Sequence, residues 1–238
     1  MRAFITLYRR EMRSYFVSPV AYIVLTLFFV LSGFFFYNIL VSSLQANMSG
    51  VFGILANLLL FTTPFITMRL VAEEKRSGTM ELLLTSPVRP LDIILSKFLA
   101  AWSLIGIVIA GTLIYVILLL AFSQEGMEIG PLVLGYLGLI LLSGAVVALG
   151  LLASSLAESQ MAAGIMGFGF SFILILLEWV GQGGKGVFHA ILRELSLFSH
   201  FGDFYLGVFD IKHLVFFLFW GVVCIFFAVK SIEARLLK

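Results

Sequence analysis

The chain has 238 residues, of which 61% are hydrophobic and only 12% are charged. This composition lies well outside that of soluble globular domains and indicates an integral membrane protein. The single cysteine, Cys224, excludes a disulfide framework and a thiol-based metal site, and a net charge of +2 does not by itself indicate a nucleic-acid partner. We therefore predict one transmembrane domain over residues 1–238.

The first predicted element is an amphipathic helix over residues 1–16. Its apolar side chains fall near one helical face, whereas its arginines lie mostly elsewhere. The apolar set comprises Phe4, Leu7, Tyr8, Met12 and Tyr15. We expect this helix to lie in the membrane interface and to lead into the first span. A cleaved signal peptide is the alternative, but the apolar run that follows continues to about Leu40 without a small-residue cleavage site.

Six transmembrane helices are predicted from the uncharged intervals, because a bilayer core requires about 20 apolar residues per helix. The predicted spans are Val20–Leu40, Val51–Met68, Phe98–Phe122, Leu132–Ser154, Met161–Val180 and His213–Val229. The fold class is thus an all-α polytopic membrane protein.

The orientation of these spans follows from the positions of lysine and arginine. A cytoplasmic N-terminus places twelve of these residues in the cytoplasm and leaves three outside, namely Lys185, Arg193 and Lys212. We predict a multi-pass protein of the bacterial inner membrane with both termini in the cytoplasm.

The segment from Arg69 to Lys97 is a polar island between two spans and contains five of the fifteen basic residues. The run Ser77–Thr79 supplies a break and an N-cap hydroxyl, and Glu81 lies where a carboxylate favours a helix N-terminus. Pro87 ends the run, and Pro90 suits the first turn of the next helix. The sequence predicts a short cytoplasmic helix with an apolar face, held between two spans.

Within this island, the stretch A-E-E-K-R-S-G-T-M-E-L-L-L-T-S-P-V-R-P-L-D-I-I-L-S-K over residues 72–97 resembles the first cytoplasmic loop of permease subunits of ABC-2 type exporters. The resemblance implies a coupling helix that docks into a cleft of a separate ATPase subunit, which binds ATP and Mg; no cofactor is implied for this chain. The implied coupling residues are Glu73, Glu74, Arg76, Gly78, Thr79, Met80, Glu81, Leu83, Leu84 and Pro87.

A second polar segment, residues 181–212, lies on the predicted outer side. Its apolar residues are too few to cross the bilayer, so we expect one or two interfacial or re-entrant helices there. The tail from Ser196 to His213 resembles the gliding-motility and NosY-like branch of ABC-2 permeases.

Two groups of residues in the outer segment could in principle form a binding site. The glycines around Lys185 resemble a phosphate-binding loop, but no Ser or Thr follows the lysine and no strand precedes it. His189, His200 and His213 could contribute to a metal site, yet their spacings of eleven and thirteen residues match no compact ligand pattern. We predict neither a catalytic nor a metal site in this chain.

The sequence contains no signature of an energy source for transport, and this limits the classes of transporter to which the chain could belong. The predicted spans lack Asp, Glu, Lys and Arg except for Glu178, so no ion-coupling relay is visible. No Walker motif is present either, and energy must therefore come from another polypeptide. The leading hypothesis is the permease subunit of an ATP-driven exporter, and the alternative is a mechanotransmitter that passes ATP-driven motion through residues 181–212 to a periplasmic protein.

The leading hypothesis includes a homodimer with two ATPase subunits. Ala163 and Gly167 form a small-x-x-x-small pair in the fifth span, and Gly164 adds surface without a side chain. We predict that these three residues form part of the dimer seam. The alternative is that they pack only within one chain.

Overall fold

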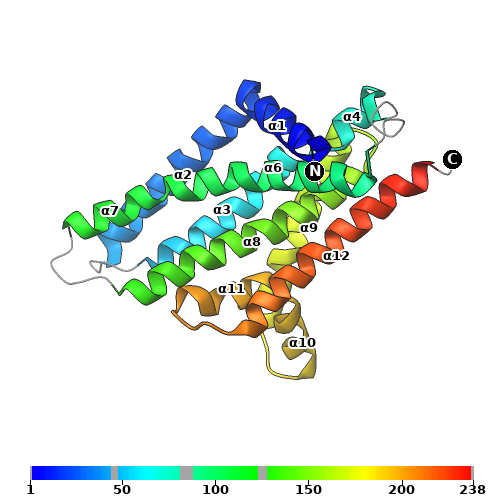
Figure 1. Ribbon diagram of the computed structural model, residues 1–238. Helices are drawn as coiled ribbons and strands as arrows, with labels where there is room; N and C mark the ends of the chain where they lie inside the picture. The colour runs from blue at the N-terminus through cyan, green and yellow to red at the C-terminus, as the bar shows by residue number, and fades with distance from the viewer. Residues whose placement is uncertain (1, 44–47, 81–87, 123–127, 237–238) are drawn as a thin grey trace.

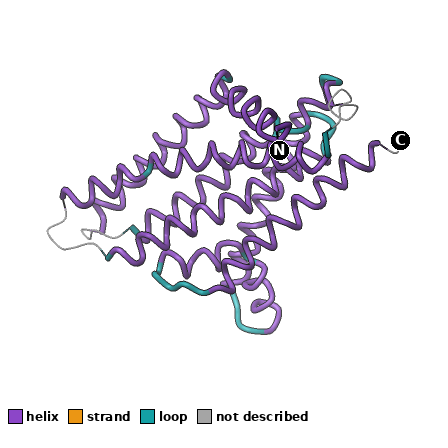
Figure 2. Tube along the Cα trace, in the orientation of Figure 1, coloured by secondary structure: helices purple, strands orange, loops and turns teal. Residues whose placement is uncertain are grey.

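The computed structural model describes residues 2–43, 48–80, 88–122 and 128–236, and every regular element in these ranges is an α-helix (Figure 2). In chain order the helices are α1 (Arg2–Val17), α2 (Pro19–Ser43), α3 (Ser49–Thr67), α4 (Ala72–Arg76), α6 (Pro90–Gly111), α7 (Leu113–Phe122), α8 (Ile129–Leu156), α9 (Gln160–Gln182), α10 (Val187–Leu195), α11 (Leu197–Tyr205) and α12 (Ile211–Leu236). The predicted all-helical class is confirmed.

Six of the helical segments are long and apolar enough to cross a membrane, as the sequence predicted. They are Pro19–Ser42, Ser49–Arg76, Pro90–Ala121, Ile129–Leu156, Gln160–Gln182 and Ile211–Ala234. The third is longer than predicted, because a count of apolar residues detects only the hydrocarbon-crossing part of a helix. Pro90 in the first turn, with Asp92 beside it, begins this helix well before the apolar run.

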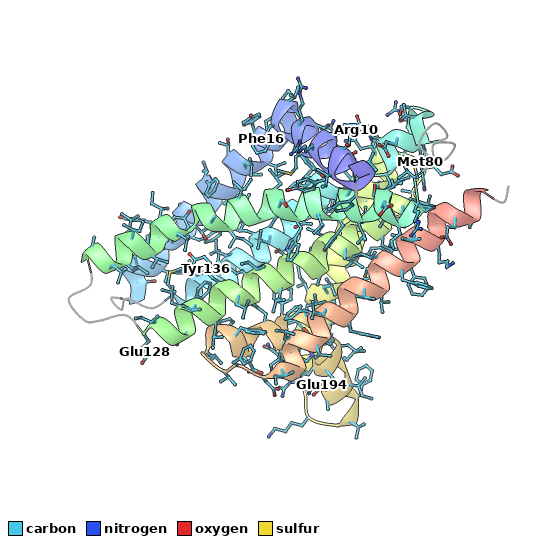
Figure 3. All side chains as sticks on the ribbon, viewed as in Figure 1. Arg10, Phe16, Met80, Glu128, Tyr136 and Glu194 are labelled. Atoms are coloured by element: carbon cyan, nitrogen blue, oxygen red, sulfur yellow. The ribbon has the colours of Figure 1, made fainter. Side chains whose placement is uncertain are left out.

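The ends of the bundle differ in what they carry (Figure 1). Helix α1, helix α4 and the C-terminal end of α12 gather at one end, whereas α7 and the α10–α11 pair lie away from it. Figure 3 places Arg10 and Met80 at the first end, and Glu128 and Glu194 away from it. We call the first end the inner end and the α10–α11 region the outer end, following the predicted orientation.

Helix α8 is the centre of the bundle and packs against α3, α6, α9, α11 and α12. Glycines allow some of these contacts to be very close. A Cβ atom at Gly135 would lie 2.3 Å from the Phe52 ring, and one at Gly150 would lie 2.3 Å from Thr67 Oγ1. The core is therefore built around α8, and the positions of the helices around it depend on its missing side chains.

Helix α1 forms as predicted, but much of its apolar face packs against protein rather than lipid. Tyr15 is 9% exposed and donates a hydrogen bond to the Ile66 carbonyl at 3.2 Å. Tyr8 donates to Ser103 Oγ on α6 at 3.0 Å. A periodic apolar face predicts an amphipathic helix but does not specify what covers it.

The two short outer helices also form as expected, and they differ sharply in burial. Helix α11 packs against α8, and Leu197, Phe201 and Phe204 are at most 1% exposed. Helix α10, by contrast, has no buried residue. Within the outer segment, α11 thus belongs to the core and α10 lies on the surface.

Candidate functional site

Helix α4 lies near the start of the predicted coupling segment, residues 69–97, and its N-terminus is capped by a side chain from α8. The backbone N–H groups of Val71 and Ala72 donate to Ser154 Oγ at 3.0 and 3.1 Å. Ser154 in turn donates to the Met68 carbonyl at 3.2 Å. Because the first N–H groups of a helix have no partner within it, this hydroxyl fixes the start of α4.

On one side, α4 joins a group of four charged residues that we call the inner ion cluster: Arg10, Glu11, Glu74 and Lys97. Lys97 Nζ lies 3.0 Å from Glu11 Oε1 and 2.9 Å from Glu74 Oε2. Arg10 Nη2 lies 3.1 Å from Glu11 Oε1 and 2.7 Å from Glu74 Oε1. The cluster joins α1, α4 and α6, which are distant in sequence.

Burial makes this cluster energetically important. The Lys97 side chain is 2% exposed and both carboxylates are 13% exposed, whereas Arg10 is 52% exposed. A buried charge is tolerated when it is paired and hydrogen-bonded. Two cations and two carboxylates give a net charge of zero, so the cluster is balanced as it stands.

On the other side, Lys75 ties α4 to the C-terminal end of α8. Lys75 Nζ donates to the Ser155 carbonyl and, at 3.3 Å, to the Ala157 carbonyl. Ser231 on α12 donates to the same Ser155 carbonyl at 2.9 Å. A cation at the carbonyl end of a helix is favourable, both through hydrogen bonds and through the helix dipole.

The predicted coupling residues that the structure describes fall into an exposed and a covered group. Glu73 is 50% exposed and pairs with Arg69 at 2.9 Å, and Arg76, Gly78 and Thr79 are also exposed. Gly78 has φ of +72°, a conformation that favours glycine, so the predicted break is present.

Glu74 and Met80 are the covered members of the predicted set. Glu74 belongs to the inner ion cluster, and Met80 is 4% exposed within the hydrophobic core of its own chain. Thr79 and Met80 are helical. Glu81, Leu83, Leu84 and Pro87 lie outside the described residues.

The predicted dimer-seam residues contact α3 and the turn after it in the same chain. Ala163 is 2% exposed. A Cβ atom at Gly164 would lie 3.3 Å from Met68 Sδ, and one at Gly167 would lie 3.2 Å from Pro64 Cβ. These contacts are those of the intrachain alternative, and the homodimer stays a prediction.

The outer end holds a second polar cluster, which the spacing of its residues did not predict. Ser196 and Ser199 donate to Glu178 on α9, the latter at 2.9 Å. Ser196 also caps α11, because its Oγ accepts from the Ser199 backbone N–H. Glu178 thereby joins the fifth span to α11.

Two histidines extend this cluster from α11 to the start of α12. His200 Nδ1 faces His213 Nδ1 at 2.5 Å, and His213 Nε2 faces Asp203 Oδ2 at 2.8 Å. His200 Nε2 lies 3.0 Å from the Glu194 carbonyl, to which it must donate. We call His200, His213, Asp203, Glu194 and the nearby Lys212 the outer histidine cluster; Lys212 Nζ pairs with Glu194 Oε2 at 2.7 Å.

These contacts assign the protons of the two rings. Since His200 donates through Nε2, neutral His200 must accept at Nδ1, and His213 donates from its own Nδ1. His213 also donates from Nε2, because the Asp203 carboxylate can only accept. Burial is the main cause that lowers the pKa of His200 below its ordinary value. A second proton on His200 would place two N–H groups against each other and break the contact.

One local signal, a turn between α11 and α12, could have predicted that His200 and His213 lie close together although they are thirteen residues apart in the sequence. Gly207, with φ of +84°, reverses the chain between α11 and α12 and so brings His200 and His213 together. The third histidine, His189, instead contacts the ring of Phe188. Within the described ranges, His, Cys, Asp and Glu side chains form no group of three or more that could hold a metal ion.

Comparison with known proteins complements this geometry. A family model described as ABC-2 family transporter protein matches residues 40–229. The search of curated proteins finds no match. The matched region includes all of α3 to α11, together with the described part of the predicted coupling segment.

Proposed function

Because the chain belongs to the ABC-2 family of transporter proteins, we propose that it is the permease subunit of an ATP-driven exporter that works as a homodimer with two copies of a separate ABC ATPase. Members of this family are membrane components of ABC transporters and not their ATPases. ATP and Mg are bound by the partner, and this chain supplies the membrane path. We place it in the bacterial inner membrane with both termini in the cytoplasm, from the distribution of lysine and arginine.

The observation that carries this proposal is the anchoring of α4, the first helix of the predicted coupling segment. Glu74 ties it to α1 and α6, and Lys75 ties it to α8 and, through the shared Ser155 carbonyl, to α12. A force applied to the segment after Gly78 would therefore reach four membrane elements through short polar contacts. Such an arrangement suits a helix moved by an ATPase.

The proposed homodimer uses surface that the single chain leaves uncovered. The first, fifth and sixth spans are the least buried. The first and fifth spans, α2 and α9, both pack against α3. Met161, Ile165 and Phe172 are all more than half exposed on the face of α9 turned away from α3. Gly169 adds a position where a Cβ would meet nothing within 4 Å. We propose that this face carries the dimer contact on α9, next to the predicted seam residues Ala163, Gly164 and Gly167, which pack within the single chain.

The family resemblance supports a hydrophobic or amphipathic substrate, carried along the dimer interface. The similarity of residues 196–213 supports assignment to the gliding-motility and NosY-like branch. ATP-dependent movement of a lipid-like fluorescent substrate in vesicles that contain permease and ATPase tests the export proposal.

The coupling assignment is tested by Leu83→Asp. An unpaired carboxylate in an apolar groove costs several kcal/mol, so the variant should insert normally and yet lose ATPase binding. Lys238→Ala serves as the control and should change neither property. Unchanged ATPase affinity in Leu83→Asp would remove this segment from the docking surface.

A second candidate is favoured by α10. Its Val187, Phe188 and Ile191 are each more than half exposed, on a short helix at the outer end. Such a face suits a periplasmic partner that receives ATP-driven motion, with little or no transport by the chain itself. Capture of an outer-side protein by wild type but not by Phe188→Asp, together with no substrate movement in vesicles, would favour this candidate.

A further inference from the structure

The inner ion cluster has a role that stability alone does not explain. Replacing a buried group of ion pairs by well-packed apolar residues is often neutral or stabilising, whereas removal of one partner is costly. Helix α4 could therefore be held at least as firmly by apolar contacts. What charges add is a strict geometry, because Lys97 Nζ must stay within reach of two carboxylates on two different helices.

The contacts around the inner ion cluster define which helices would move together with α4. Helix α1 is also joined to α6 by the Tyr8–Ser103 hydrogen bond and to α3 by Tyr15. Lys97 lies in the inner part of α6, near the end that begins at Pro90. The predicted coupling segment, residues 69–97, begins with α4 and ends in the inner part of α6, and the Glu74–Lys97 ion pair joins these two parts.

We propose that Lys97 is a positioning residue for transmission: through Glu74 and Glu11 it makes α4, α1 and the inner part of α6 move as one body when the coupling segment moves. This inference rests on the proposed function and adds the route by which motion enters the spans. Glu11 gives α1 an active part in that route, since it contacts the same ammonium as Glu74. Arg10 balances the charge from the exposed side.

The test uses a variant in which the cluster loses its charges without leaving any of them unpaired and buried. Lys97→Met, Glu11→Gln and Glu74→Gln are combined, which leaves only Arg10, whose side chain is 52% exposed. Glu233→Gln is the matched control, because Glu233 also lies at the inner end but belongs to a more exposed pair with Lys230 on α12. Arg10→Met is a milder second variant that keeps Lys97 paired.

The first measurement is hydrogen exchange of the full chain in lipid nanodiscs. We expect the amides of α4 to exchange at least about tenfold faster in the triple variant, about threefold faster in Arg10→Met, and at an unchanged rate in Glu233→Gln. The amides of α8 should not change in any of them. Unchanged protection of α4 in both cluster variants would overturn the inference, and Arg10→Met keeps this test decisive if the triple variant does not fold.

The second measurement uses the complex isolated through a tag on the permease, with Mg-ATP and vanadate added. In the wild type, the exchange of α1 and of residues 90–97 should change together with that of α4. Because Glu74 is covered within its own chain, the ATPase should remain bound to the triple variant. The change in exchange should stop at α4. A full response of α1 in that variant would refute transmission through Lys97, whereas a wild-type chain that retains no ATPase would refute the proposed function instead.

Discussion

The inner ion cluster and the outer histidine cluster both join elements that are distant in sequence, but with different chemistry. The inner one uses lysine, arginine and glutamate, and its central Lys97 is 2% exposed. The outer one is centred on two histidines, and its Lys212–Glu194 pair is 56% and 59% exposed. The inner cluster is therefore built from buried ion pairs, whereas the outer one depends on His200, whose pKa is lowered by burial.

This difference indicates that the inner and outer ends of the bundle have different functions. Full charges that are buried together resist separation, which suits the end where an ATPase would apply force. Histidine contacts break when a proton is added, which makes the α11–α12 connection sensitive to its surroundings. The following four variants and conditions test this contrast.

The largest effect is expected for Lys97→Met alone. It leaves Glu11 and Glu74 buried with only Arg10 as counter-ion, and loss of one partner from a buried pair costs about 3–5 kcal/mol. Unfolding of the detergent-solubilised chain by increasing denaturant should show this loss. A cost under about 1 kcal/mol would mean that water reaches the carboxylates and that the two clusters do not differ in burial.

A smaller loss is expected for His213→Leu. The substitution removes the partner of His200 Nδ1 and of Asp203, and an unsatisfied buried polar group costs about 1–3 kcal/mol. The same unfolding measurement applies. His189→Leu is the control, because His189 is a histidine of the same outer segment that does not contact this cluster, and its effect should be clearly smaller.

Acidification should weaken the outer histidine cluster through His200. Because burial lowers the pKa of His200, the unfolded chain binds a proton more readily than the folded one. The contribution is fully present above the ordinary pKa of about 6.5 and is lost as pH falls from there toward the lowered value. Hydrogen exchange of α11 between pH 7.5 and 5.5 measures it. His200→Phe should abolish the pH dependence, and an unaltered dependence would assign it to another group.

The smallest effect is expected for Lys212→Met. Exposed ion pairs contribute about 0–1 kcal/mol, and both side chains of this pair are more than half exposed. Its comparison with Lys97→Met contrasts the same substitution in the two clusters, one buried and one exposed. Equal costs for the two lysines would contradict the contrast.

Much of the fold could be predicted because the bilayer requirement acts on contiguous sequence. The six spans follow from runs of about 20 apolar residues, and Pro90 and Gly78 mark a start and a break through local backbone chemistry. The coupling segment stays a prediction, which rests on the resemblance of the continuous stretch over residues 72–97.

The clusters could not be predicted, because each combines residues that only tertiary packing brings together. Glu11, Glu74 and Lys97 lie on three helices, and nothing in their spacing indicates a contact. Likewise, the apolar residues of α1 indicated a face but not its partner, and the small residues of α9 indicated close packing but not whether one chain or two supplied the neighbour. In the structure of the single chain, α3 supplies it.

The glycines of α8 restrict how a transport cycle can proceed. Gly135 fits against Phe52 and Gly150 against Thr67, while Gly138 fits against Phe201 and Phe204, so residues from two different elements occupy notches in one helix. If α8 turned about its axis or slid by one residue, neighbouring side chains would replace these notches and collide with the bulky groups. Helix α8 and the parts of α3 and α11 that fit its glycines should therefore move as one group during a transport cycle.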